Sequence, residues 1–426
     1  MTRARRLRPL DGPVDAVVAV PGSKSIANRA LVCAALAPGT SELANVPDGD
    51  DTAAMLAGLA ALGAGVDSEP GHVRLTGIED PPGIAEAEVH AALAGTTSRF
   101  LTALAALGRR PVTIDGFPAL RRREFGPLHD ALGQLGVRVT PGDGSGHLPV
   151  TVQGPPVAGA VSIAGDVSSQ YITALMLIGP CLPDGLRLEL TSALVSRPYV
   201  EMTAAVMEAF GITGVDVGRA HVHVAPRRYA TCRYDVEPDA SSASYPLAVA
   251  AVRGGRVQVS GLGDRSLQGD ARFADLLASM GCAVSRRTDA TVVSRASGIA
   301  LRGVDVDMAD ISDLVPTVAA VAMFADTPTR ISGVGFIRGK ESDRLGDLAR
   351  ELSAVGGEVS ETDDGLVVEP SRHRLHGALL ATHHDHRLAM AFGVVGTVVQ
   401  GIEVSDPDVV TKSWPRFWQM LDGLAT

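Results

Sequence analysis

The chain repeats one pattern six times, and this repetition limits the folds that it can adopt. In each repeat a short polar group precedes an apolar run rich in Ala and Leu, which is typical of a buried helix. Equivalent points in the six runs are separated by 72, 72, 73, 72 and 72 residues, at the positions Ser25, Thr97, Ser169, Ser242, Leu314 and His386. A spacing this regular predicts six copies of one structural unit.

A second helix is predicted inside each of the first five repeats, and each of these helices stops at a glycine. The glycines are Gly63, Gly136, Gly211, Gly281 and Gly356. Glycine suits a helix C-terminus because it adopts the left-handed conformation without strain. Short β-branched segments follow and predict strands. One such unit cannot bury both faces of its helices, so we expect the units to pack on one another.

Six units divide naturally into two α/β domains of three units each. We predict the boundary near Arg233–Pro238, just before the fourth repeated helix. Residues 22–236 then form the first domain, and residues 1–21 with 237–426 form the second. The first predicted strand, Val14–Val20, belongs with the C-terminal half in this division, so the chain passes between the domains twice.

Composition narrows the class of protein. The chain has 48 acidic and 38 basic residues, a net charge of −10, and no basic block, which argues against nucleic-acid binding. No apolar stretch follows the arginines at its start, and its longest apolar runs are too short to span a bilayer. The four cysteines form no CxxC pair and predict neither disulfides nor a metal site. We therefore expect a cytoplasmic protein with no membrane segment.

Cations collect at the starts of the repeated helices. Lys24 and Arg29, Arg99, and His386 with Arg387 all lie in such starts. N-capping explains the Ser, Thr and Asp residues there, but it needs no Lys or Arg, which the helix macrodipole disfavours at this end. A cation beside free backbone N–H groups indicates a bound anion. The pattern predicts anionic, phosphorylated substrates.

The segment RGKESDRL places Lys340, Glu341 and Arg344 close together in the sequence. Their spacing predicts that Lys340 and Arg344 share a helix face. Two interpretations remain open: a solvated helix with an ion-pair ladder, or a Glu341 carboxylate held among cations for proton transfer. Asp313, at the start of the fifth repeated helix, is either an N-cap or a second such carboxylate.

Nine motifs in order along the chain resemble the 5-enolpyruvylshikimate-3-phosphate synthase family of enolpyruvyl transferases. They are PGSKSIANRAL, GTTSRFLTAL, DVSSQYITAL, SRPY, EPDASSASYPLA, QGDARFADLL, KESDRL, DHRLAMA and TKSWPRF, and they run from Pro21 to Phe417. The resemblance implies a two-domain α/β fold of six βαβαββ units, three per domain, with the active site in the interdomain cleft.

The resemblance also implies a reaction. Members of the family transfer the carboxyvinyl group of phosphoenolpyruvate to the 5-hydroxyl of shikimate 3-phosphate and release phosphate, in the shikimate pathway to chorismate and aromatic amino acids. It implies no metal and no organic cofactor, no partners besides these two small molecules, and a monomer. It further implies that glyphosate competes with phosphoenolpyruvate.

Roles for individual residues come from the same resemblance. It implies that Asp313 acts as the base toward the hydroxyl, and that Glu341 protonates the methylene carbon with Lys24 close by. The residues implied to bind shikimate 3-phosphate are Lys24, Ser25, Arg29, Ser168, Ser169, Gln170, Ser196, Tyr199, Asp313 and Lys340. Those implied to bind phosphoenolpyruvate are Lys24, Gly95, Arg123, Gln170, Arg344, Arg387 and Lys412, with Gly95 leaving room for the phosphate.

Departures from the family pattern leave other functions open. Phe336 stands where the family often has an Asn that contacts the acceptor, so a paralogue acting on another acceptor, such as a nucleotide in secondary metabolism, is one alternative. The related enzyme for UDP-N-acetylglucosamine carries a loop cysteine, and Thr113–Glu124 contains none. A non-catalytic binding protein is a third alternative, but it would tolerate the loss of Asp313 or Glu341, and both are present.

Overall fold

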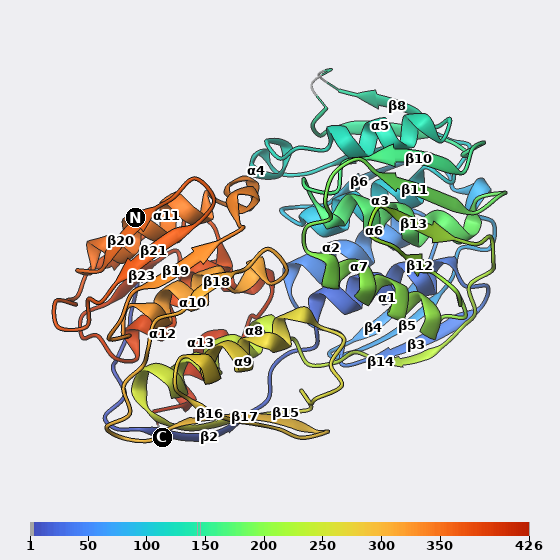
Figure 1. Cartoon of the computed structure of the whole chain (residues 1–426). Helices are drawn as coiled ribbons and strands as arrows, with labels where there is room; N and C mark the ends of the chain where they lie inside the picture. The colour runs from blue at the N-terminus through green and yellow to red at the C-terminus, as the bar shows by residue number, and fades with distance from the viewer. Residues whose placement is uncertain (1–3, 143, 145, 426) are drawn as a thin grey trace. The chain divides into compact units, whose positions relative to one another are not determined.

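The computed structural model describes residues 4–142, 144 and 146–425, and the chain divides into two compact units (Figure 1). We call Gly22–Val236 the N-terminal unit, and Met1–Pro21 together with Glu237–Thr426 the C-terminal unit. Each unit has a hydrophobic core of its own.

The helices and strands of the N-terminal unit follow the three predicted repeats. The first repeat comprises α1 (Lys24–Leu36), β3 (Thr40–Ala44), α2 (Asp50–Ala61), β4 (Gly65–Glu69) and β5 (His72–Thr76). The second comprises η1 (Pro81–Gly83), β6 (Ala87–His90), α3 (Gly95–Ala105), β7 (Val112–Asp115), α4 (Pro118–Arg121), α5 (Gly126–Gln134), β8 (Arg138–Pro141) and β9 (Val150–Gln153). The third comprises β10 (Ala160–Ile163), α6 (Ser169–Ile178), η2 (Gly179–Cys181), β11 (Leu186–Leu190), α7 (Arg197–Ala209), β12 (Asp216–Val217) and β13 (His221–Val224), and β14 (Arg233–Asp235) follows it.

The C-terminal unit begins with the two first strands of the chain, β1 (Ala4–Arg6) and β2 (Val14–Val18). Its first repeat comprises α8 (Ala240–Arg253), β15 (Gly255–Ser260), η3 (Gly269–Arg272), α9 (Phe273–Ser279), β16 (Ala283–Arg286) and β17 (Ala290–Arg295). The next comprises β18 (Asp305–Asp307), η4 (Ser312–Leu314), α10 (Val315–Ala322), β19 (Thr329–Ser332), η5 (Gly335–Gly339), α11 (Arg344–Ala354), β20 (Glu358–Glu361) and β21 (Leu366–Glu369). The last comprises β22 (Leu379–Leu380), α12 (His386–Gly396), β23 (Glu403–Ser405), η6 (Pro407–Lys412) and α13 (Phe417–Gly423).

One sheet topology recurs through both units. In the order β6-β7-β9-β8, the first pair is parallel and the other two pairs are antiparallel, with Val89 opposite Ile114 and Ile114 opposite Val150. The sheets β10-β11-β13-β12, β14-β3-β5-β4, β16-β17-β15-β2 and β18-β19-β21-β20 share this arrangement. The recurrence confirms the fold predicted from the six-fold repeat.

Two strands belong to one unit although the helix that follows each of them in the chain belongs to the other unit. Strand β2 precedes α1 but pairs in parallel with β15 of the C-terminal unit, and β14 precedes α8 but pairs in parallel with β3 of the N-terminal unit. The last repeat departs from the βαβαββ pattern within the described residues. Its sheet has three strands in the order β1-β23-β22. Strand β1, from the start of the chain, pairs antiparallel with β23, and β22 pairs parallel with β23.

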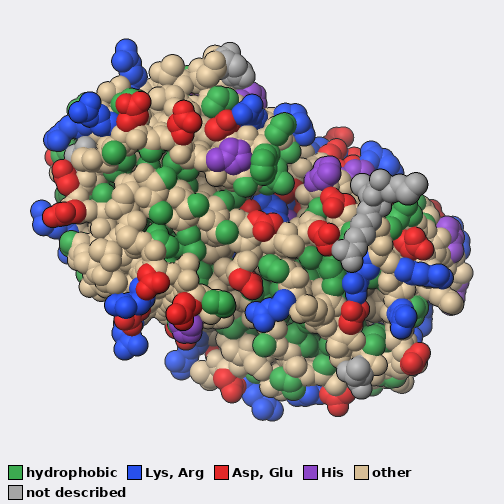
Figure 2. Space-filling model, turned by 180° about the vertical axis from the view of Figure 1, so that it is seen from behind, with side chains coloured by type: hydrophobic (Ala, Val, Ile, Leu, Met, Phe, Trp, Pro, Cys, Tyr) green, Lys and Arg blue, Asp and Glu red, His purple; other side chains and the backbone are tan. Residues whose placement is uncertain are grey.

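The six repeated helices are buried almost all round. From Ile26 to Leu36 every residue of α1 is buried, and α3, α6, α8, α10 and α12 are buried to a similar extent. A helix that is apolar on all sides needs neighbours on all sides, and the many Ala residues allow close approach. Charged side chains of both signs are interspersed on the face of the molecule seen in Figure 2.

The predicted helix ends are confirmed, with one correction. The five glycines named above all have positive φ, from 85° to 105°. The prediction that Lys340 and Arg344 share a helix face is wrong, because α11 begins at Arg344 and Lys340 follows the separate turn η5. Asp343 caps α11 and accepts a hydrogen bond from the Gly346 amide. None of the described helices is long and apolar enough to cross a membrane.

Candidate active site

Lys24, in the first turn of α1, is held by a carboxylate from α2. Its Nζ atom lies 2.8 Å from Oδ2 of Asp51, whose side chain is only 5% exposed. The Thr97 hydroxyl at the start of α3 donates to the Asp51 carbonyl at 3.0 Å. These contacts bring together the starts of α1, α2 and α3. Sequence reasoning missed Asp51, although the GDD run at the start of α2 marks the position.

Arg99 links the second and third repeats of the N-terminal unit. Its guanidinium donates to Oε1 of Gln170 at 2.7 Å and to the Glu124 carbonyl at 3.1 Å, and it lies over the ring of Phe125. The Tyr171 hydroxyl donates to the same carbonyl at 2.6 Å. Because the Gln170 oxygen is occupied by Arg99, its amide N–H group is oriented for an acceptor. Arg99 therefore positions Gln170, which is one of the predicted site residues.

Gly95, the first residue of α3, lies beneath two guanidinium groups. A Cβ atom added at Gly95 would lie 2.4 Å from Nη1 of Arg123 and 2.8 Å from Nη1 of Arg99. The structure brings Gly95 and Arg123 together, and the Arg123 guanidinium lies in the space where the resemblance implied room for the phosphate.

Arg29 lies in the interior of the N-terminal unit, only 2% exposed. It donates to the hydroxyls of Thr203 and Thr173 and to the carbonyls of Ser25 and Tyr199. Burial lowers its pKa to about 10, so it remains a cation at neutral pH. These bonds tie α1 to α6 and α7, and the Arg29 guanidinium joins the carbonyls of Ser25 and Tyr199.

The predicted serines occupy helix starts in the third repeat. Ser168 is the N-cap of α6, and its hydroxyl accepts a hydrogen bond from the backbone N–H of Gln170 at 3.3 Å. Ser169 is buried in the first turn of α6. Ser196 precedes α7 with a left-handed backbone, φ 53°. Helix starts present backbone N–H groups, so these positions suit an anion.

Arg344 is the centre of an ion cluster in the C-terminal unit. Its guanidinium donates to Asp385 at 2.7 Å, to Asp313 at 2.9 Å and to Glu341 at 2.8 Å, and its side chain is 2% exposed. Burial would lower the pKa of Arg344, but the three carboxylates raise it above its usual value. The solvated ion-pair ladder considered above is therefore wrong. Asp385, the N-cap of α12, is fully buried and was not singled out by the sequence.

Asp313 bridges two cations. One oxygen accepts from Arg344 and the other accepts from Nη2 of Arg387 at 2.6 Å. Neither η4 nor α10 has a side-chain N-cap bond, so the interpretation of Asp313 as a cap is wrong. Burial would raise the pKa of Asp313, but Arg387, Arg344 and Lys340 hold it well below its usual range. The carboxylate is ionised at neutral pH.

Glu341 and two lysines complete this cluster. One Glu341 oxygen accepts from Arg344, and the other lies 4.0 Å from Nζ of Lys412, which is largely buried. The Lys340 ammonium lies 5.8 Å from the centre of the Phe336 ring. The predicted residues of this unit, Asp313, Lys340, Glu341, Arg344, Arg387 and Lys412, therefore form one charged cluster.

Asp270 is a buried carboxyl group close to this cluster that the sequence did not identify. The Ser241 hydroxyl makes a short hydrogen bond to its Oδ2, and its side chain is almost fully buried. Burial, together with the negative charge of Asp313, raises the pKa of Asp270 to about 7. This group changes its charge near neutral pH.

We expect Asp270→Asn to change how stability depends on pH. Between the unfolded pKa near 4 and the folded pKa of about 7, the folded state binds one proton more than the unfolded state. The contribution of Asp270 to the free energy of unfolding therefore falls as pH rises through that window. The amide keeps the hydrogen bond from Ser241 and carries no charge. In thermal melts, the Tm of the variant minus the Tm of the parent chain should therefore be larger at pH 8 than at pH 5. Asp275→Asn, at an exposed carboxylate paired with Arg286, is the control. A gap equal at both pH values would contradict the assignment.

The two units offer complementary chemistry. The N-terminal unit supplies cations and helix N-termini, which bind phosphate and carboxylate groups. The C-terminal unit supplies two carboxylates among cations, which can move protons. Neither unit alone contains all the predicted residues.

Comparison with known proteins assigns the chain to a family. The model of the EPSP synthase (3-phosphoshikimate 1-carboxyvinyltransferase) family matches residues 10–421. The chain belongs to this family. Relatives named 3-phosphoshikimate 1-carboxyvinyltransferase include one from Methanosphaerula palustris, 41% identical over 96% of this chain and 97% of the relative. Another, from Trichormus variabilis, is 39% identical over 97% of this chain and 98% of the relative.

Solved structures show the same fold. An EPSP synthase from Acinetobacter baumannii superposes with a TM-score of 0.83 at 21% identity, covering 99% of this chain and 98% of that one. The two-domain α/β fold expected from the resemblance is thereby confirmed.

Proposed function

We propose that the chain is a 3-phosphoshikimate 1-carboxyvinyltransferase, which joins the enolpyruvyl group of phosphoenolpyruvate to the 5-hydroxyl of shikimate 3-phosphate and releases phosphate. The observation that carries the proposal is the cluster around Arg344, which holds Asp313 and Glu341 as ionisable groups among cations. Membership of the family supports the same reaction.

Asp313 is the proposed base toward the hydroxyl. Its low pKa makes it a weak base while both oxygens accept from guanidinium groups. Arg344 and Arg387 are also the proposed partners of the phosphoenolpyruvate carboxylate. A second anion that competes for these donors weakens their hold on Asp313, and its negative charge raises the pKa of Asp313. Substrate binding would thus activate the base at the moment that it is needed.

Glu341 is the proposed acid toward the methylene carbon. Like Asp313, Glu341 accepts a hydrogen bond from Arg344, and it also faces Lys412, so its ionised form is stabilised by cations that phosphoenolpyruvate would also bind. An incoming anion that competes for these cations favours the protonated form of Glu341. A carboxylic acid near carbon can then donate its proton.

The N-terminal unit is proposed to hold the anionic ends of both substrates. Lys24 and Arg123 suit the phosphate of phosphoenolpyruvate, since Arg offers parallel donors and Lys a compact charge. The starts of α6 and α7, with Ser168, Ser169 and Ser196, suit the phosphate of shikimate 3-phosphate. Because the carboxylates come from the other unit, we propose that catalysis requires residues of both.

Gly95→Ala should weaken phosphoenolpyruvate binding. The added methyl would meet Nη1 of Arg123 at 2.4 Å, so the guanidinium must shift. Since a misplacement near 1 Å can cost up to about a hundredfold, we expect KM for phosphoenolpyruvate to rise between about tenfold and a hundredfold. Gly126→Ala is the matched control, because Gly126 also begins a helix and its added methyl would meet nothing within 4 Å. Equal KM values in both variants would show that Arg123 does not bind this substrate.

One assay tests the proposed function directly. Phosphate release from phosphoenolpyruvate is measured with shikimate 3-phosphate as the only acceptor, and the product is identified by its mass. UDP-N-acetylglucosamine serves as the comparison acceptor. Turnover with shikimate 3-phosphate alone supports the proposal, whereas phosphate release only with another acceptor would show a paralogue with a different substrate.

A further inference from the structure

The N-terminal unit contains a pocket that the proposed reaction does not use. Its volume is about 680 Å³, within the usual range for small-molecule sites. It lies where the repeated helices end: Leu36 is the last residue of α1, Leu107 follows α3, and Cys181 ends the turn after α6. The candidate site residues lie at the starts of these helices. Because α1 has 13 residues, the two ends are about 20 Å apart.

The walls of this pocket are largely apolar. Six prolines contribute to the lining, along with Leu36, Leu107 and Leu182. Proline rings offer flat aliphatic surface without a backbone N–H group. Such walls favour a flat apolar body over a hydrated ion.

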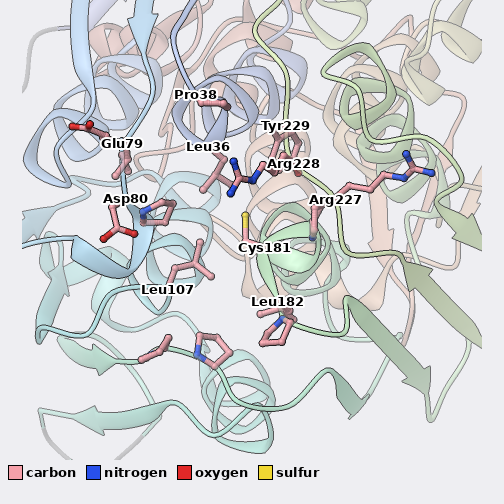
Figure 3. A pocket seen from close by; sticks show the side chains of 16 residues that line it. Leu36, Pro38, Glu79, Asp80, Leu107, Cys181, Leu182, Arg227, Arg228 and Tyr229 are labelled. Carbon is pink, nitrogen blue, oxygen red and sulfur yellow. The ribbon is translucent and has the colours of Figure 1, made fainter.

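Two arginines, Arg227 and Arg228, line the pocket, and the side chain of one of them points into it. Figure 3 shows the Arg228 side chain reaching toward Leu36 and Cys181, whereas the neighbouring Arg227 extends away from them. Arg228 is an exposed residue, and within the described residues its side chain has no hydrogen bond and no ion pair. The acidic residues of the lining, Glu79 and Asp80, lie across the pocket from Arg228 in the same view.

We propose that this pocket binds a small amphipathic anion, whose flat apolar body fills the proline-lined hollow and whose acidic group pairs with Arg228. A guanidinium on an apolar wall can hold a carboxylate or sulfonate through two parallel hydrogen bonds. The position of the pocket at the far ends of the helices makes it separate from the candidate active site.

The first test uses 8-anilino-1-naphthalenesulfonate, an aromatic body with one acidic group, in a fluorescence titration of the full chain. We expect one site per chain, and displacement by 1-naphthoate but not by the uncharged 1-naphthalenemethanol. Phosphoenolpyruvate with shikimate 3-phosphate should not displace the probe. Displacement by this substrate pair, or equal displacement by the charged and uncharged competitors, would overturn the proposal.

Three variants locate the probe. Arg228→Gln should weaken its binding at least about fivefold, whereas Arg227→Gln, the matched control, should change it less than about twofold. Cys181→Trp adds an indole from an exposed position on the wall and should abolish binding. Circular dichroism melts show whether each variant is folded. Equal losses for the two arginine variants, or full binding by a folded Cys181→Trp variant, would show that the probe binds elsewhere.

Discussion

Replacing either proposed catalytic carboxylate by its amide should lower kcat by at least about a hundredfold, the usual loss when an acid or base is removed. Asp313→Asn and Glu341→Gln keep the shape of the side chain and remove the charge that takes up or delivers a proton. Both groups contact Arg344, so the amides preserve part of the hydrogen bonding around it. Steady-state phosphate release at saturating substrates measures the effect.

The control for this experiment is a carboxylate from the same segment. Asp310 lies three residues before Asp313, is partly exposed and pairs with Arg272 at 3.4 Å. Asp310→Asn should leave kcat within about twofold of the parent, as expected for an exposed ion pair. Near-normal turnover in a folded Asp313→Asn or Glu341→Gln variant would remove that residue from the mechanism.

Arg344→Leu should destabilise the C-terminal unit by about 3–5 kcal/mol, the range seen when one partner of a buried ion cluster is removed. The substitution leaves Asp385, Asp313 and Glu341 close together without the guanidinium that all three share. Asp385 is fully buried, so water cannot replace the lost hydrogen bonds. Arg350→Leu on the same helix is the control, because Arg350 is largely exposed and its pair with Asp347 is worth at most about 1 kcal/mol.

Tryptophan fluorescence during urea unfolding measures the free energy of unfolding of the C-terminal unit. The chain has two tryptophans, Trp414 and Trp418, and both belong to the C-terminal unit. The folded pKa of Asp313 is depressed, so its contribution to stability is present above its unfolded pKa and is lost as pH falls. The difference in the free energy of unfolding between the parent and Arg344→Leu should therefore become smaller below about pH 4. A gap under about 1 kcal/mol at pH 7 would mean that the cluster does not stabilise this unit.

Local features of the fold could be read from the sequence because they are set by neighbours along the chain. The repeated helices follow from apolar runs at regular spacing, and their partner helices end at glycines because a positive φ is cheapest there. The strand after each glycine follows from β-branched residues. The cations at helix starts and the ordered motifs likewise marked most of the residues of the charged cluster around Arg344.

Pairing between distant residues was decided by the tertiary structure. Asp51 holds Lys24 across 27 positions, Asp385 meets Arg344 across 41, and Asp313 meets Arg387 across 74. The sequence marked Lys24, Arg344 and Arg387 as cations of the site but did not show which carboxylate each one meets, because a carboxylate acquires its partner only when packing brings two helix starts together. The same holds for β14, whose partner strand β3 lies far along the chain, whereas the sequence already assigned β2 to the C-terminal unit. Periodicity along the chain determined the elements, and the burial of helix starts against one another determined which charges meet.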